Sequence, residues 1–246
     1  MLPSLTDTPK PRWARRKTAR PQELLAAALD LFVERGFAAT RLDDVAAQAG
    51  VSKGTLYLYF ENKEELFKAV VRENMLPLLG EAEAVIDGYQ GHSAALFRDI
   101  MMGWWERIGD TRLSGITKLM MAESGNFPEL ARFYHEEVIC RADGMIRRLL
   151  ERGMARGEFR RIDTANATSV VIAPVLMLMM WKHSFTACHP EPIAPRPYLE
   201  CVIDLLLNGM AAALPASASP DSTPPVSVLP ESPPAGVTHH RNLPHA

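Results

Sequence analysis

Residues 51–60 read VSKGTLYLYF. They follow Gly50 directly and place three aromatic side chains, Tyr57, Tyr59 and Phe60, among their last four residues. A helix that ends at a glycine, a tight turn and a second short helix are typical of the helix-turn-helix motif. In that motif the second helix enters the major groove of DNA and the first helix supports it. We therefore interpret this stretch as a recognition helix.

Helical spacing divides the side chains of the stretch between an inward-facing set and an outward-facing set. Leu56 and Phe60 lie four residues apart and are predicted to face inward, onto Phe32 and Val45. Hydroxyl groups and a lysine can bind phosphates and base edges, and a glycine lets the backbone approach them closely. The predicted DNA-facing residues are Lys53, Gly54, Thr55, Tyr57 and Tyr59. The alternative is that a short aromatic helix between two others is simply part of a core.

The flanking sequence is predicted to be helical. PQELLAAALDLFVERG begins with a proline suited to a first helical turn, and Gly36 ends the helix. TRLDDVAAQAG opens with Thr40 and Asp43, spaced as in a capping box, and Ser52 can cap the third helix, which is predicted to run to about Phe60. A fourth helix starts near NKEELFKAVVRENM, and Pro77 is expected to kink or end it.

The string FVERGFAATRLDDVAAQAGVSKGTLYLYFENKEELFKAVV resembles the DNA-binding domain of the TetR family of bacterial regulators, in one register over roughly residues 20–70. The resemblance implies a three-helix DNA-binding domain, a larger helical ligand domain, a homodimer, and repression that a small molecule relieves. It implies that DNA is contacted by Thr40, Lys53, Gly54, Thr55, Tyr57, Leu58, Tyr59 and Lys63. Arg41 occupies a place where the family often has serine or threonine, and its phosphate contact would be stronger and more salt-sensitive.

Charge and cysteine usage fit this interpretation. The chain has 246 residues and a net charge of −2, but residues 10–72 carry twelve Lys or Arg against eight Asp or Glu. Such an excess favours an anionic partner, here a double-stranded DNA operator. The three cysteines form no CxxC motif, and the N-terminus lacks the apolar segment of a signal peptide, so we expect a reduced, cytoplasmic protein.

No membrane span, cofactor or metal is expected. The strongest apolar run, residues 170–181, is interrupted by Pro174 and is predicted to be a core helix. His183, Cys188 and His189 lie near one another, but we interpret them as a polar helix end because no second ligand pair stands at metal spacing.

The two ends of the chain differ from the rest. Residues 1–19 form a basic arm that is predicted to be flexible, and Arg15, Arg16 and Lys17 in it either reach DNA or remain solvated. Residues 215–246 are rich in proline and serine and are predicted to be disordered.

Residues 20–71 are thus assigned to the DNA-binding domain and residues 72–214 to a helical ligand-binding and dimerisation domain, in an all-α protein. NFPELARFYHEEV and LLERGMARGEFR are similar to the AefR-like branch of the family. That similarity implies a dimer interface built from helices at about 164–186 and 197–213. Pro77 is either a joint between the two domains or only a helix end.

A set of methionine and aromatic residues is predicted to line a pocket for a small hydrophobic ligand, since methionine-rich walls adapt to varied apolar molecules. The set is Met101, Trp104, Trp105, Met120, Met121, Phe133, Met177, Met180 and Trp181. The alternative is that most of them belong to the core or the dimer interface.

The leading functional hypothesis is a homodimeric repressor released from its operator by a hydrophobic ligand. The alternatives are an activator or a regulator without a ligand and, in a different class, an all-α enzyme. Against an enzyme, the sequence contains no nucleophile elbow, HExxH motif or phosphate-binding loop.

Overall fold

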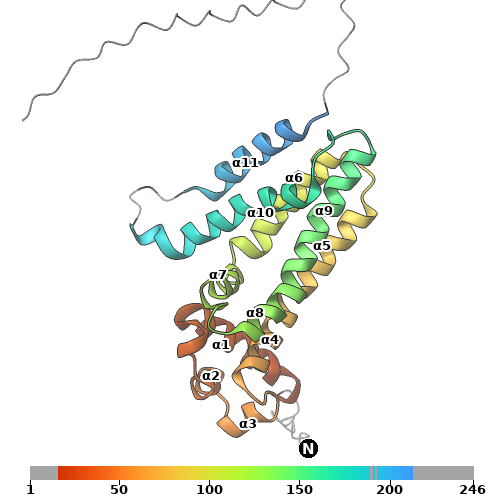
Figure 1. Ribbon diagram of the computed structural model, residues 1–246. Coiled ribbons are helices and arrows are strands. Elements are labelled where there is room, and N and C mark those ends of the chain that lie inside the picture. The colour runs from red at the N-terminus through yellow and green to blue at the C-terminus, as the bar shows by residue number, and fades with distance from the viewer. Residues whose placement is uncertain (1–15, 189–190, 192, 213–246) are drawn as a thin grey trace, which may run out of the picture. The chain divides into compact units, whose positions relative to one another are not determined.

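The structure, a computed structural model, describes residues 16–188, 191 and 193–212 (Figure 1). The regular elements in these residues are helices, so the predicted all-α fold is confirmed. The predicted disordered tail lies outside the described residues, as does most of the basic arm. The α-helices are α1 (Arg16–Ala39), α2 (Leu42–Gln48), α3 (Lys53–Tyr57), α4 (Lys63–Asn74), α5 (Leu76–Gly88), α6 (Ser93–Trp104), α7 (Ser114–Glu123), α8 (Pro128–Tyr134), α9 (Cys140–Ala155), α10 (Thr164–Met180) and α11 (Pro195–Met210).

Tighter or wider turns extend three of these helices. π-helical turns follow α6, α8 and α10, namely η1 (Trp105–Gly109), η2 (His135–Ile139) and η3 (Trp181–Phe185). A short 3-10 turn, η4 (Thr186–Cys188), follows the last of them.

The first helix begins earlier than predicted and is broken where predicted. α1 starts at Arg16, so Pro21 lies inside the helix instead of at its start, and the helix takes in the last residues of the predicted arm. Gly36 has φ +83° and ψ 169°, a combination open essentially to glycine alone. The chain therefore turns at Gly36 before the last residues of α1, which confirms the predicted break.

A buried side chain stabilises the corner between α1 and α2. The predicted capping box at the start of α2 is wrong. The residue before α2 is Arg41, whose side chain makes no capping hydrogen bond. Thr40 is 1% exposed, and its hydroxyl lies 2.7 Å from the carbonyl oxygen of Gly36 and 3.1 Å from that of Leu31. Thr40 thus secures the end of α1 and does not cap α2.

The turn into α3 follows the sequence closely. Gly50 has φ +67°, and the side chain of Ser52 accepts a hydrogen bond of 3.1 Å from the backbone N–H of Thr55, which confirms the predicted cap. α3 ends at Tyr57, about one turn short of the predicted end at Phe60. Leu56 is fully buried, as predicted, and Phe60 is half-buried against the core.

Three aromatic rings hold the N-terminal helices together. The centroid of Phe32 lies 5.6 Å from that of Phe37 and 5.4 Å from that of Phe67, and the rings of Phe37 and Phe67 are 5.7 Å apart. The rings come from α1 and α4, and all three are fully buried. Phe32 and Phe37 are stacked, and Phe67 meets both edge to face; aromatic pairs of these two kinds add to the stability gained from burial.

Pro77 stands in the first turn of α5, where its missing N–H costs least. α4 ends at Asn74, so the proline marks the junction of two consecutive helices. The predicted domain boundary near residue 72 falls just before this junction. Whether the junction acts as a joint stays a prediction.

The remaining helices pack around α9. It lies against α5, α6 and α10, and α11 packs on α6 and α10 at one side of the bundle (Figure 1). The two halves of the chain also touch, because α7 packs on α1 and α8 on α4.

The Gly36 backbone gives a direct stability test. Replacing Gly36 with alanine should lower the free energy of unfolding by about 1–3 kcal/mol, because φ +83° is unfavourable for a residue with a Cβ. The matched control is Gly144→Ala in the middle of α9, where the new methyl group has room and should raise stability by about 0.5–1 kcal/mol. Urea unfolding followed by circular dichroism measures both; a Gly36→Ala protein as stable as the parent would contradict this role.

Candidate nucleic-acid interface and ligand cavity

The outer face of α3 and the turn after it present large side chains to solvent. Tyr57 and Tyr59 are exposed, and Leu58 is 82% exposed. Solvent-exposed apolar side chains of this size mark interaction surfaces when they gather together. The face agrees with the predicted outward side of the recognition helix.

The polar residues of α3 are held by partners at the surface. The Nζ of Lys53 lies 2.9 Å from a carboxylate oxygen of Asp43, and this carboxylate raises the pKa of Lys53. The hydroxyls of Thr55 and Ser52 lie 2.8 Å apart. Gly54 is exposed, and the nearest atom to a Cβ added there would be 3.9 Å away, so its backbone is open to approach. These side chains can exchange such partners for phosphate oxygens.

Two predicted DNA contacts are instead engaged within the protein. The ammonium group of Lys63 donates to the carbonyl oxygens of Phe37, at 2.7 Å, and Ala38, at 3.0 Å, and lies 4.5 Å from the centre of the Phe37 ring. Burial lowers the pKa of Lys63. Lys63 therefore satisfies the last carbonyls of α1, as Thr40 does at the same corner. The burial of Thr40 leaves it out of the interface, whereas a contact of the half-buried Lys63 with DNA stays a prediction.

The remaining predicted contacts lie at the start of two helices. Arg41 is exposed directly before α2. Arg16 and Lys17 belong to the first turns of α1, whereas Arg15 lies outside the described residues. Their contact with DNA stays a prediction.

A cavity of about 510 Å³ lies among α5 to α10. Its wall is almost wholly apolar and includes four of the residues predicted for a ligand pocket: Met101, Trp104, Met120 and Met121. A volume of this size suits a drug-sized ligand.

The other five predicted pocket residues do not line this cavity. Trp105 is buried, with the ammonium of Lys182 5.7 Å from its ring centre. Phe133 packs under the guanidinium of Arg72, 4.9 Å from its ring centre. Met177, Met180 and Trp181 lie exposed or half-buried in α10 and η3. Helical spacing alone could not tell these surfaces apart.

Sequence reasoning missed much of the wall, above all the part from α5. Leu78, Ala82 and Val85 line the cavity and stand at the i, i+4 and i+7 positions of one helix face. That periodicity indicates an apolar helix face, but a pocket predicted from methionine and aromatic residues does not include it.

One polar pair stands in the apolar wall. Thr117 of α7 and Tyr134 of α8 both line the cavity, and their hydroxyl oxygens lie 2.9 Å apart. Burial raises the pKa of Tyr134 to about 12, so its hydroxyl stays protonated at neutral pH.

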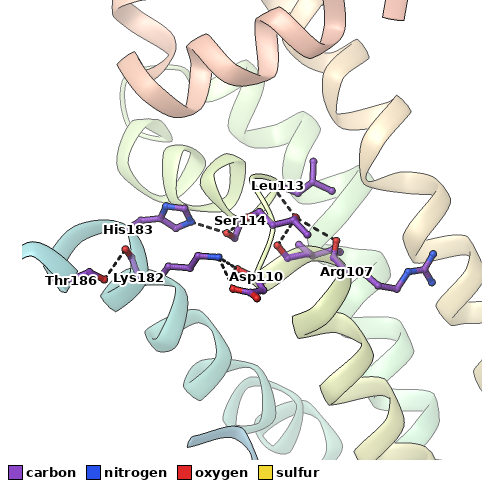
Figure 2. Close-up of polar contacts among 10 residues, drawn as sticks. Arg107, Asp110, Leu113, Ser114, Lys182, His183 and Thr186 are labelled. Carbon is purple, nitrogen blue, oxygen red and sulfur yellow. Dashed lines mark hydrogen bonds and ion pairs between the residues drawn. The ribbon is translucent and has the colours of Figure 1, made fainter. Parts of the chain in front are cut away.

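The end of α10 is tied to the start of α7 by polar contacts (Figure 2). Lys182 donates to the carbonyl oxygen of Gly109 and to Asp110, each at 3.1 Å. The Nε2 of His183 lies 2.7 Å from the hydroxyl oxygen of Ser114, which itself donates to the carbonyl oxygen of Thr111. His183 must then donate from Nε2, and burial, with Lys182 and Lys118 nearby, lowers its pKa.

These contacts account for His183 without a metal. Within the part of the chain that the structure describes, no three His, Cys, Asp or Glu side chains are grouped to hold a metal ion. His189, the other predicted histidine of this region, lies outside the described residues.

The chain matches two family descriptions. Residues 24–70 match "Bacterial regulatory proteins, tetR family", and residues 97–207 match "AefR-like transcriptional repressor, C-terminal domain".

Individual relatives agree. The fatty acid metabolism regulator protein of Bacillus subtilis (strain 168) is 30% identical over 110 residues, 44% of this chain and 57% of the relative, so the chain spans little more than half of that protein. The transcriptional repressor KstR2 of Rhodococcus jostii (strain RHA1) is 29% identical over 195 residues, 78% of this chain and 93% of the relative. Among solved structures, a SmeT–triclosan complex has a TM-score of 0.67 and 25% identity, and covers 87% of this chain and 100% of that one.

The helix-turn-helix motif, the fold built around it and these matches agree, and the chain belongs to the TetR family of transcriptional regulators, with a C-terminal domain of the AefR-like type.

Proposed function

We propose that the protein is a homodimeric repressor that binds its operator through α3 and is released when a small hydrophobic ligand enters the cavity. The observation that carries this proposal is that one helix serves both sites. α7 lines the cavity with Thr117, Met120 and Met121 and also packs on α1. A ligand that displaces α7 therefore acts directly on the DNA-binding helices.

The contact between α7 and α1 is close and specific. A Cβ added to Gly115 of α7 would lie 2.5 Å from a methyl carbon of Val33, so the Val33 side chain of α1 packs directly on the backbone of α7. Arg112, just before α7, forms an ion pair with Asp30 of α1. Because closely packed interiors have low compressibility, a displacement of α7 is transmitted to α1 through this contact.

Dimerisation is proposed through the outer faces of α10 and α11. Met177 is 53% exposed and Leu205 is 67% exposed, on neighbouring helices that pack together. α10 with η3, Thr164–Phe185, is long and apolar enough by length and composition to span a membrane, and only 28% of its most apolar stretch is buried within one copy of the chain. We propose that a second copy of the chain covers this surface, as in other oligomers with a paired helical seam.

The names of the relatives favour repression over activation. The Rhodococcus jostii relative is named a repressor, and it aligns with most of this chain. The SmeT structure holds triclosan, a small hydrophobic molecule, in a protein of the same fold.

The role of α3 can be tested by DNA titration. Tyr57→Ala should weaken binding to an operator duplex from the gene's own upstream region about tenfold or more, because a side chain on the DNA-facing surface is lost. Arg41→Ala should instead lower the slope of log affinity against log salt by about one. Fluorescence anisotropy measures both, with scrambled duplexes and Tyr89→Ala, remote from α3, as controls. Unchanged affinity in Tyr57→Ala would remove α3 from the interface.

The role of the cavity can be tested at Gly103. This residue lines the cavity, and an added Cβ meets nothing within 4 Å, so Gly103→Phe should fill the space without disturbing the fold. We expect Gly103→Phe to bind operator within about twofold of the parent but to bind the neutral apolar dye Nile red at least tenfold more weakly. Gly103→Ala is the matched control and should retain the dye. Equal dye binding by the two variants would place the dye elsewhere.

The proposed dimer surface can be tested at Leu205. Leu205→Glu places a charge in the seam and should weaken the dimer at least tenfold in sedimentation equilibrium, since an unpaired charge is costly to bury. The same change at the exposed Ala155 of α9 should have no effect. A Leu205→Glu protein that remains as dimeric as the parent would rule out this face.

A further inference from the structure

The polar groups of the cavity restrict the chemical class of the ligand, which the cavity volume alone does not. This inference rests on the proposed ligand-binding role. Among the described residues of the cavity wall, Thr117 and Tyr134 form a hydroxyl pair whose oxygens lie 2.9 Å apart. Two hydroxyls carry two protons, and their mutual hydrogen bond uses one of them. Neither side chain makes a further hydrogen bond to the described residues, so one proton and several lone pairs remain for a ligand.

The charged groups of the wall disfavour an anion. Among the described lining residues the charged ones are Asp99, Arg107 and Asp143. The guanidinium of Arg107 is already paired with Glu81 of α5. Asp99 and Arg107 are exposed and Asp143 is half-buried, so these charges lie toward solvent. A carboxylate bound among the buried side chains of the wall would leave its charge unpaired there, which is strongly unfavourable.

The buried part of the cavity wall does not suit a cationic head group of a ligand either. Tyr134 and Thr117 offer a neutral hydrogen-bonding site, and Tyr134 is among the most buried residues of the cavity. A hydroxyl or carbonyl group can bind there without bringing a charge into the apolar interior.

We infer that the ligand is an uncharged amphiphile, whose apolar body fills the cavity and whose single hydroxyl or carbonyl group binds the Thr117–Tyr134 pair.

The position of this pair connects ligand chemistry to regulation. Thr117 belongs to α7 and Tyr134 to the end of α8, and these helices pack on α1 and α4. A polar group bound at the pair exchanges a contact between α7 and α8 for contacts with the ligand. The apolar body supplies affinity, and the polar group acts at the helices that hold the DNA-binding domain.

A matched series of twelve-carbon probes separates the possible head groups. We would titrate the full-length protein at pH 7.5 with 1-dodecanol, dodecanoate and dodecylammonium by isothermal calorimetry. The alcohol is kept below its solubility limit and the two ions below their micelle concentrations. We expect 1-dodecanol to bind at least about tenfold more tightly than dodecanoate and more tightly than dodecylammonium. Tyr134→Phe should weaken 1-dodecanol about two- to tenfold, the range of one hydrogen bond, and should leave dodecanoate unchanged.

The control is Tyr89→Phe, which removes a phenol outside the cavity and should change none of the three affinities. Tighter binding of dodecanoate overturns the inference, and tighter binding of dodecylammonium moves the head group to Asp99 and Asp143 and overturns it as well. Failure of all three probes, or of Tyr134→Phe to weaken the alcohol, also overturns it.

Operator titrations on the same samples keep this test apart from the proposed function. If 1-dodecanol binds with the expected preference but leaves operator affinity unchanged, the ligand class stands and ligand-induced release is wrong. If dodecanoate binds best and releases the operator, release stands and the ligand class is wrong.

Discussion

The ring of Phe37 belongs to both halves of the molecule, and the rest of the structure depends on where it lies. On one side it stacks with Phe32 and meets Phe67 edge to face in the core of the DNA-binding helices. On the other side its centroid is 4.7 Å from that of Phe127, the residue before α8. It can serve both because Gly36 turns the chain through a conformation that other residues avoid. The ammonium of Lys63 then satisfies the carbonyl of Phe37 that the turn leaves without a helical partner. A single corner thereby joins the recognition motif to the ligand domain.

Much of the fold could be predicted because local chemistry and tertiary structure agree. Gly36, Gly50 and Ser52 act within a few residues of themselves, and the sequence places each of them correctly. The internal contacts of Thr40 and Lys63 were not predicted because their hydrogen-bond acceptors belong to α1, and no pattern within a short window indicates that pairing. Both polar side chains complete a helix end, and that of Thr40 is buried where an exposed contact had been expected.

The cavity was harder to predict than the motif. Its apolar character was predicted from the methionine and aromatic residues, but its walls come from six helices whose facing sides depend on how they pack. Trp104 and Trp105 are adjacent in sequence, yet only the first lines the cavity, because consecutive helical residues point about 100° apart. The polar pair joins residues from two helices, and only the tertiary structure brings Thr117 to Tyr134.

Two connections link the ligand domain to the DNA-binding helices, and their mechanical properties differ. At Pro77 the chain passes from α4 to α5 through the first turn of a new helix, and we expect this covalent link to bend more readily than an unbroken helix. At Gly115 the contact of α7 with Val33 has no free space, and the ion pair of Arg112 with Asp30 lies close by. A link that bends cannot transmit a displacement of the ligand domain to the DNA-binding helices. A closely packed contact cannot act as the axis about which those helices rotate. We therefore expect α7 to act as the lever that moves the DNA-binding helices and the α4–α5 junction to act as the hinge about which they turn, so that each connection needs the other.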